Sequence, residues 1–328
     1  MWDNELTVEK AKKYDFIHCS FWFQCLKCIR LGIPYILDVH DNEPFLSGKD
    51  DLFYKTYSKA IENSLVTVGQ TDQTKEHWSH LEHKIVTVPV PIDIETLTID
   101  SNIQREDHVL CVGAVQKIKG HRYLARACNE LGLYLTIIGN SDDVEEADAI
   151  RHQIAHSDGR IKWIDKAIPF DEVIGHYKRC RVFAMTTLMD VPGLVYLEAL
   201  SCGANVVATE QGDYKSTNPK IVRTSLDNLS IQDALQKAWD MPHDTSGREY
   251  VVNNHSPELS TERYIDFVYN GNWVVPDTFS SVESMSSALY RMDFSDPTGI
   301  RMLSLIHISE PTRPERIAGS GVGVKKKR

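Results

Sequence analysis

The sequence predicts an α/β fold of two doubly wound domains that face a shared cleft, with the first domain incomplete. Short apolar runs rich in Val and Ile alternate with helical stretches along most of the 328 residues, as in parallel sheets covered on both faces. A Pro-rich step at 88–93 interrupts this rhythm and marks a hinge. Strand–helix–strand spacing on both sides of the hinge implies right-handed parallel crossovers.

Before the hinge, four apolar runs are short enough to be buried strands. A helix follows the first run and is expected to end at Leu31, because Gly32 is a typical helix stop. The four predicted strands are 15–19, 34–39, 65–69 and 84–88.

After the hinge the pattern repeats more clearly, with a helix predicted at 120–131. The stretch "SPELSTERYIDFVYN" (256–270) predicts a further amphipathic helix, with a Ser cap and a Pro in its first turn. The predicted strands of this half are 108–112, 133–139, 161–164, 181–186 and 205–209.

These patterns give the following domain organisation. We expect a partial N-terminal domain at 1–92, a second domain at 93–255, a helix returning to the first domain at 256–270, a loop-rich extension at 271–302 and a tail at 303–328. The tail begins with "LSLIHISEPTR", which looks like a translated sequencing adapter and is therefore kept out of the fold prediction. The alternative is a genuine disordered basic tail.

Composition narrows the class of protein. A hydrophobic content of 42% with 25% charged residues is typical of a soluble globular protein. The net charge of -10 argues against a broad nucleic-acid surface, although a small-molecule ligand can still occupy a locally basic pocket. No apolar run approaches the ~20 residues that a membrane span needs.

Seven cysteines without regular spacing indicate reduced thiols and a cytoplasmic location. Cys25 and Cys28 form an isolated CxxC pair, which as a zinc or redox site would need a second ligand pair or a helix N-terminus. Ordinary buried thiols are therefore the favoured interpretation.

The stretch "MDVPGLVYLEALSCGANVVAT" (189–209) carries two acids in apolar surroundings. Asp190 precedes a helix that has Pro192 near its first position, and the amides of Gly193, Leu194 and Val195 at this helix start would attract an anion. Glu198 is expected to face the same cleft, where a carboxylate can accept two hydrogen bonds from a ribose diol. The alternative is a solvated Glu favoured by the helix dipole alone.

Two further segments place polar groups after predicted strands. In "VGAVQKIKGHRYL" (112–124), Gly113 ends a strand, and Lys117 and Lys119 lie near Gly120, so that Lys119 could offer its ammonium to a phosphate. The alternative is a pair of exposed loop lysines. Gly139 ends the next strand, and Asn140 and Ser141 are candidate caps for the following helix. Doubly wound sheets bind ligands at these carboxyl ends.

Together these motifs resemble the nucleotide-sugar domain of retaining GT-B glycosyltransferases of the family 4 (group 1) type. The likeness covers roughly residues 10 to 270. Its first two motifs are matched by Gly113, Lys119 and Gly120 and by Gly139. The third motif is matched by Asp190, Gly193, Leu194, Glu198, Ala199, Gly203, Val206, Val207 and Ala208.

The resemblance implies two Rossmann-like domains and the transfer of a sugar from a nucleoside diphosphate-sugar, with retention of configuration and without a metal or cofactor. Lys119 and the 193–195 amides would hold the donor phosphates, and Glu198 would bind the ribose. Asp190 would contact the donor sugar near its reacting carbon. His40, in "DVHDNEP", matches a His that the family has after this strand, from where it could reach the donor sugar; the alternative is a loop His with one polar contact.

The acceptor would be a glycan, a lipid or a small molecule, with no nucleic acid as partner and no indication of peripheral membrane contact. Ala114 replaces the family's Arg, with Lys117 as a candidate substitute, and Asp190 replaces a Glu. These departures keep two alternatives open: a catalytically impaired nucleotide-sugar-binding relative and a GT-B-like sugar-nucleotide epimerase. The family's opening strand and Gly-rich turn are missing before 15–19, which predicts an N-terminally truncated fragment with an exposed strand edge.

Overall fold

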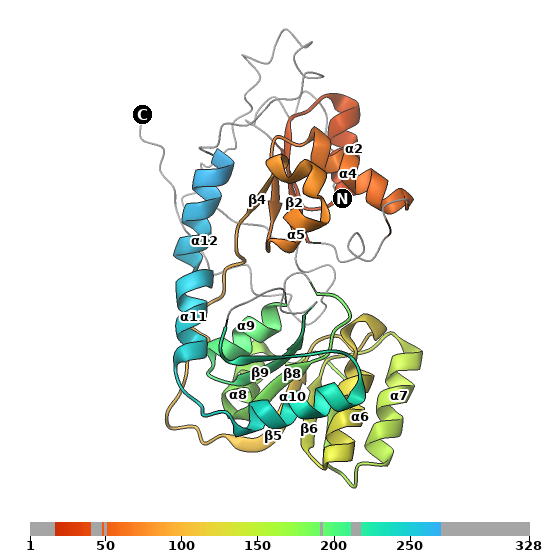
Figure 1. The fold of residues 1–328 in the computed structure, drawn as a ribbon, viewed down its shortest axis with the longest axis vertical. Coiled ribbons are helices and arrows are strands. Elements are labelled where there is room, and N and C mark those ends of the chain that lie inside the picture. The colour runs from red at the N-terminus through yellow and green to blue at the C-terminus, as the bar shows by residue number, and fades with distance from the viewer. Residues whose placement is uncertain (1–16, 41–47, 49–50, 191–192, 211–217, 270–328) are drawn as a thin grey trace. The chain divides into compact units, whose positions relative to one another are not determined.

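The computed structural model describes residues 17–40, 48, 51–190, 193–210 and 218–269. Pro192, the extension at 271–302 and the tail at 303–328 lie outside the described residues. Contacts divide the described chain into unit 1, residues 17–89 and 260–269, and unit 2, residues 90–259 (Figure 1).

Unit 1 contains a parallel sheet of four strands in the order β1-β2-β3-β4. The strands are β1 (Ile17–Cys19), β2 (Tyr35–Val39), β3 (Thr67–Gly69) and β4 (Ile85–Thr87). All four confirm predicted strands, with slightly shorter bounds. Their helices are α2 (Trp22–Leu31), α4 (Leu52–Asn63) and α5 (Gln73–His77), and a 3-10 helix spans Ser79–Lys84.

Unit 1 is stabilised by aromatic packing and by a buried hydrogen bond, and its first helix ends at a glycine. Trp78 stacks on Tyr57, with ring centroids 5.4 Å apart, and the hydroxyl of Tyr35 donates to the carbonyl of Ala60 at 2.6 Å. Helix α2 ends at Gly32 as predicted, in the left-handed conformation (φ 63°) that glycine adopts at low cost.

The cysteines are buried and unpaired throughout the chain. The Sγ atoms of Cys19 and Cys28 lie 3.8 Å apart. Their hydrogen bond, and then burial, raise the pKa of the Cys28 thiol. Within the described ranges, no group of three or more His, Cys, Asp or Glu side chains is arranged to hold a metal ion. No helix among these same residues is long and apolar enough to cross a membrane.

Unit 2 contains a parallel sheet of six strands in the order β10-β9-β8-β5-β6-β7. The strands β5 (Glu106–Val112), β6 (Tyr134–Ile138), β7 (Ile161–Ile164), β8 (Cys180–Met185) and β9 (Asn205–Thr209) confirm the five predicted ones. Strand β10 (Ile221–Thr224) was not predicted; it is a half-buried edge strand that pairs with β9 from Ile221 opposite Val206. Its two central residues are not buried, so its apolar signal is weak.

Helices cover both faces of this sheet (Figure 1). On one face α6 (His121–Leu131) contacts both α7 (Val144–Ala155) and α10 (Asn228–Asp240). On the other, α9 (Leu194–Ser201) contacts α8 (Phe170–Arg179) and α11 (Ser246–His255). The arrangement is the doubly wound, Rossmann-like fold expected from the sequence.

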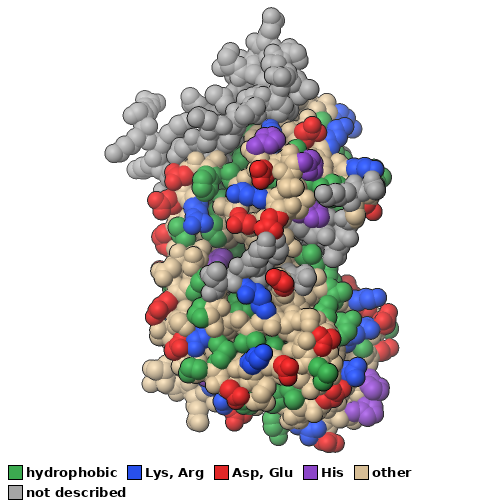
Figure 2. Space-filling model, viewed as in Figure 1, with side chains coloured by type: hydrophobic (Ala, Val, Ile, Leu, Met, Phe, Trp, Pro, Cys, Tyr) green, Lys and Arg blue, Asp and Glu red, His purple; other side chains and the backbone are tan. Residues whose placement is uncertain are grey.

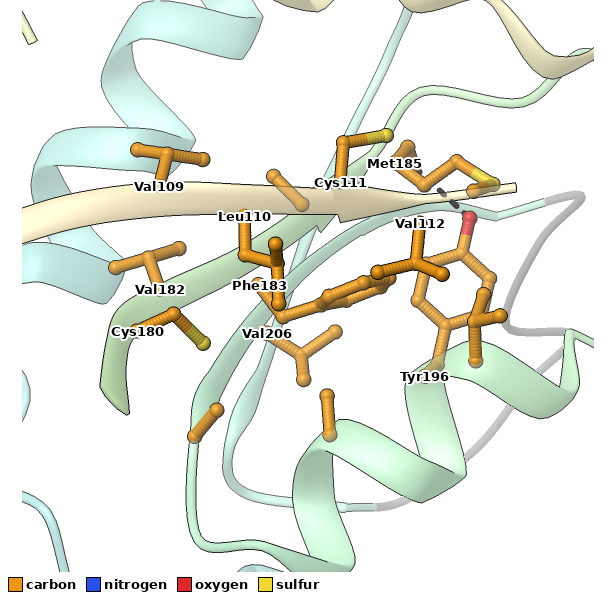
Figure 3. Packing of buried hydrophobic residues seen from close by; sticks show 14 of the residues in the cluster. Val109, Leu110, Cys111, Val112, Cys180, Val182, Phe183, Met185, Tyr196 and Val206 are labelled. Atoms are coloured by element: carbon orange, nitrogen blue, oxygen red, sulfur yellow. Dashed lines mark hydrogen bonds between the residues drawn. The ribbon is translucent and has the colours of Figure 1, made fainter. Parts of the chain in front are cut away.

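The core of unit 2 continues up to the strand ends (Figure 3). Phe183 on β8 lies fully buried with its ring 5.8 Å from that of Tyr196 on α9. The Tyr196 hydroxyl donates to the carbonyl of Met185 at 2.8 Å. This contact fixes the start of α9 to the carboxyl end of β8.

The predicted helix at 256–270 is present as α12 (Pro257–Tyr264), continued by a π-helical turn at Ile265–Tyr269. The Ser256 hydroxyl accepts from the amide of Leu259 at 3.3 Å, as predicted for its cap. The hinge segment is tied to the end of α11, where the amide of Ile92 donates to the His255 carbonyl at 2.8 Å.

Acidic and basic side chains of the described residues are interspersed over the face shown in Figure 2. On this face no single sign of charge dominates among the described residues.

Candidate functional site

The central strands of unit 2 define where a ligand fits. β5 and β8 are neighbours, and the chain leaves them toward opposite edges of the sheet, because β6 lies beyond β5 and β9 lies beyond β8. In doubly wound folds such a switch point opens a crevice at the carboxyl ends of the strands. Gly113, Lys117 and Lys119 follow β5, Gly139 follows β6, and Asp190 follows β8.

The loops after β5 and β6 touch through their backbones. A Cβ at Gly139 would lie 2.0 Å from the carbonyl oxygen of Gly113, so only glycine fits there. The amide of Val115 donates to the Asn140 carbonyl at 2.9 Å, and the Ser141 hydroxyl donates to the Val115 carbonyl at 2.6 Å.

The prediction that Asn140 or Ser141 caps the helix after β6 is wrong. Asp143 caps α7 and accepts from the amide of Glu146 at 3.0 Å. Ser141 is instead used to tie the β6 loop to the β5 loop, because its hydroxyl already donates to Val115.

A second set of contacts joins the loops after β5 and β8. The Ile118 carbonyl accepts from the Leu188 amide at 2.7 Å and from the Thr187 hydroxyl at 2.9 Å. The Thr186 hydroxyl donates to the Gly120 carbonyl at 2.8 Å. A Cβ at Gly120 would lie 1.9 Å from the backbone carbonyl oxygen of Thr186. This clamp, formed by 118–120 and 186–188, was not foreseen from the sequence.

The clamp brings Lys119 and Asp190 together. Lys119 Nζ lies 2.9 Å from Asp190 Oδ2, and each side chain is only 10% exposed. A buried ammonium with one carboxylate partner is a strong local electrostatic feature, because the low dielectric around it strengthens its attraction for anions. Two residues predicted to have separate roles thus form one ion pair.

The other lysine of the loop is placed differently. The Lys117 side chain is exposed, and its backbone amide donates to Asp143 Oδ2 at 3.1 Å. Ala114, where the resemblance expects Arg, is buried. Whether Lys117 replaces that Arg stays a prediction.

Helix α9 begins next to the ion pair in sequence. Gly193 is its N-cap residue, Leu194 and Val195 are its first two residues, and Asp190 lies three positions before the cap. The first amides of a helix have no intrahelical acceptor and carry the positive end of the helix dipole. Anion binding at this helix start stays a prediction.

Glu198 is buried rather than solvated, with 1% of the residue exposed. Its Oε2 accepts from the Tyr177 hydroxyl of α8 at 2.8 Å. The alternative of a solvent-exposed helix Glu is therefore wrong, whereas ribose binding stays a prediction. Tyr177 is a further residue that the sequence analysis did not identify.

His121, the first residue of α6, is fully buried. Burial, and then the charge of Lys119, lower the pKa of His121 to about 3. The ring is therefore neutral at physiological pH, so it adds no positive charge beside Lys119.

Trp163 on β7 is half-buried and donates from Nε1 to the Gly139 carbonyl at 2.7 Å, which supports the glycine turn after β6. His40 follows β2 in unit 1, where its ring contacts Gln70 and Asp38. It therefore makes more than the single polar contact of the alternative interpretation.

Comparisons with known proteins agree on the fold. Residues 106–238 match the family described as "Glycosyl transferases group 1". A D-inositol 3-phosphate glycosyltransferase of Pseudarthrobacter chlorophenolicus is 23% identical over 235 residues, which cover 61% of this chain and 55% of that protein. The chain thus spans about half the length of this curated relative.

Two solved structures are similar over most of the chain. Sucrose-phosphate synthase from Thermosynechococcus elongatus has a TM-score of 0.68 at 16% identity and covers 82% of this chain and 74% of its own. Anabaena HepE in complex with UDP and glucose has a TM-score of 0.65 at 14% identity and covers 80% of each chain. These likenesses show the α/β fold with two Rossmann-like domains found in GT-B glycosyltransferases.

Proposed function

We propose that this chain is a glycosyltransferase that moves a sugar from a nucleoside diphosphate-sugar to an acceptor, with retention of configuration. The buried Lys119–Asp190 pair, at the switch point of the unit 2 sheet, is the observation that carries the proposal. It lies inside the segment that matches the glycosyltransferase family.

In this proposal the donor binds to unit 2. Lys119 Nζ and the amides of Gly193, Leu194 and Val195 hold the diphosphate, whose negative charge grows as it leaves the sugar. Cations and amides that are fixed in advance stabilise this charge without reorganisation. Glu198, oriented by Tyr177, accepts hydrogen bonds from the ribose hydroxyls.

The transfer breaks the bond between the anomeric carbon and the diphosphate oxygen. The acceptor oxygen bonds to the same face of that carbon, and its proton passes to the departing diphosphate. Asp190 lies beside Lys119, where its carboxylate would favour the positive charge that develops on the sugar. In this arrangement the Lys119 ammonium interacts with both the Asp190 carboxylate and the diphosphate.

The remaining assignments rest on the resemblance alone. We propose that unit 1 provides the acceptor side, that His40 contacts the donor sugar, that the protein is cytoplasmic and that no metal or cofactor takes part. Metal independence is tested by titrating UDP with and without EDTA, with equal affinities expected.

A second candidate function is nucleotide-sugar binding without transfer. It is favoured by Ala114, whose buried methyl group occupies the place of the family's Arg. Binding of UDP together with no release of UDP from UDP-glucose, with water or sugars as acceptors, would support this second function.

Calorimetric titration with UDP and GDP tests donor binding. Lys119→Met should weaken the affinity for the preferred nucleotide ~100-fold, because a buried charge-assisted contact is lost. Lys117→Met is the matched control on the same loop and should change the affinity less than ~3-fold, because exposed charges contribute little. Absence of heat with both nucleotides, or equal losses in the two variants, would contradict the proposal.

A further inference from the structure

A second buried charge cluster lies in unit 1, at the carboxyl end of its sheet. Its centre is Asp38 on β2, a buried residue. Asp38 Oδ2 lies 2.7 Å from His18 Nε2 and 3.7 Å from His40 Nε2. The strand register explains the first contact: His18 on β1 is opposite Ile36, and Ile36 shares a sheet face with Asp38.

The opposite side of the His40 ring is also engaged. The Gln70 side chain, just after β3, donates from its amide nitrogen to His40 Nδ1. An amide nitrogen has only protons to offer, so Nδ1 must be the acceptor. The neutral His40 ring therefore carries its proton on Nε2, the nitrogen that faces Asp38.

Electrostatics favour an ionised Asp38. Burial opposes its charge, but the charge and hydrogen bond of His18, and then those of His40, hold the pKa of Asp38 well below its usual range. Burial likewise acts against a charged His18, yet Asp38 outweighs it and raises the pKa of His18. Among the described residues, the other titratable groups against this cluster are the Cys19 thiol on β1 and the Tyr264 hydroxyl on α12, which lies 3.3 Å from His18 Nε2.

Packing alone does not account for this carboxylate. Asp38 Oδ1 is buried and has no hydrogen-bond partner within the part of the chain that the structure describes. A buried carboxylate with one oxygen unsatisfied costs stability compared with an apolar side chain of the same size. We therefore infer that the carboxylate of Asp38 is present for its interaction with the two imidazoles that face Oδ2.

We propose that Asp38 is a positioning residue, which holds the imidazole of His40 in one orientation with its proton on Nε2, while His18 serves as its counter-ion. The inference rests on the proposed function only in giving His40 a contact with the donor sugar. With Nε2 facing Asp38 Oδ2 at 3.7 Å and Nδ1 hydrogen-bonded to Gln70, the two nitrogens of the ring are in different environments, which favours one tautomer.

The state of the ring can be measured directly by long-range proton–nitrogen NMR of the full chain. Signals are assigned with His18→Gln and His40→Gln. In the wild type, His40 should show a protonated Nε2 and an unprotonated Nδ1 at pH 7.5. Asp38→Leu removes the charge and both acceptor oxygens at similar volume, so the His40 signals should move toward the tautomer average and the pKa of His18 should fall.

Tyr35→Phe is the matched control, because it removes a buried hydrogen bond from the same strand without touching the cluster. It should leave the His40 signals unchanged. Unchanged His40 signals in Asp38→Leu, or equal changes in both variants, would overturn the inference.

Gln70→Glu keeps Asp38, so it tests whether the contacts of His40 set its tautomer even if Asp38→Leu does not fold. A carboxylate at position 70 can only accept, which should move the His40 proton to Nδ1 or protonate the ring. A His40 ring that keeps its wild-type signals in Gln70→Glu would show that these contacts do not set its state.

Catalysis provides a separate readout, with UDP-glucose as the probe and UDP release to water as the signal. Asp38→Leu should lower kcat about 10-fold with KM within about twofold, since misplacing a catalytic group affects the chemical step more than binding. Equal kcat values would contradict the inference. A wild-type chain that neither binds nor releases UDP would contradict the proposed function and leave the NMR comparison to decide this inference.

Discussion

The two units hold buried charge at the carboxyl ends of their sheets in different ways. In unit 2, backbone contacts between two loops bring Lys119 and Asp190 to 2.9 Å. In unit 1, side chains from neighbouring strands gather on the single carboxylate of Asp38. The first arrangement leaves a cation beside a helix start, and the second leaves an anion between two imidazoles.

The difference shows how one buried group sets the state of a nearby histidine. His121, near Lys119, has a pKa lowered by burial and then by that cation. His18, near Asp38, has a raised pKa because the carboxylate outweighs the effect of burial. His121 is therefore held neutral, whereas the pairing with Asp38 favours a charged His18.

The largest expected effect comes from Gly120→Ala, which would break the clamp in unit 2. The new Cβ would lie 1.9 Å from the Thr186 oxygen at a φ of +67°, so we expect a loss of about 3 kcal/mol in unfolding free energy. Gly132→Ala is the matched control, because Gly132 has a φ of +68° with nothing within 4 Å of its Cβ. Its cost should be only about 1 kcal/mol. Equal costs by urea denaturation would show that the clamp is not tight.

Tyr177→Phe should come next, because it removes a hydrogen bond to the buried carboxylate of Glu198. We expect a loss of about 2 kcal/mol in unfolding free energy and weaker binding of UDP. Tyr196→Phe removes a bond to a neutral carbonyl and should cost about 1 kcal/mol. A smaller loss for Tyr177→Phe than for Tyr196→Phe would contradict the assigned role of Glu198.

Acid sensitivity tests the contrast between the histidines, with an effect of about 1.4 kcal/mol or less for each pH unit. An unfolded His121 takes up a proton below about pH 6.5, whereas the folded one stays neutral down to about pH 3. The unfolding free energy of unit 2 should therefore decrease as the pH is lowered through this window, by up to about 1.4 kcal/mol per pH unit. His121→Leu should remove that slope.

His18 should behave in the opposite sense. Because its folded pKa is raised, its contribution is fully present below its unfolded pKa and is lost as the pH rises through the folded value. Denaturation series from pH 4 to 8 on His121→Leu and His18→Gln, followed by hydrogen exchange in each unit, check both slopes. Slopes of the same sign in the two units would refute the contrast.

Local patterns in the sequence predict much of unit 2. Its buried strands are continuous Val- and Ile-rich runs, and Gly113, Gly120 and Gly139 mark loops whose backbones come close. Lys119 and Asp190 were identified because each lies beside a glycine turn or a helix start. Edge strand β10 was missed, since its half-exposed "IVRT" lacks a buried pattern.

Contacts between distant strands could not be predicted in the same way. The clamp joins Thr186 and Thr187 to residues more than 60 positions earlier, and threonines after a strand suggest no particular partner. Asp38 and His18 meet only because β1 and β2 pair in one register. A shift of that register by one residue would place them on opposite faces.

A crystal structure of the chain with UDP would show whether Lys119 and the start of α9 hold the diphosphate. We expect diphosphate oxygens about 2.7–3.1 Å from Lys119 Nζ and from the amides at the start of α9, with the ribose hydroxyls on Glu198. A diphosphate bound away from Lys119, with the Lys119–Asp190 pair unchanged and no ligand at the β5–β8 switch point, would contradict it.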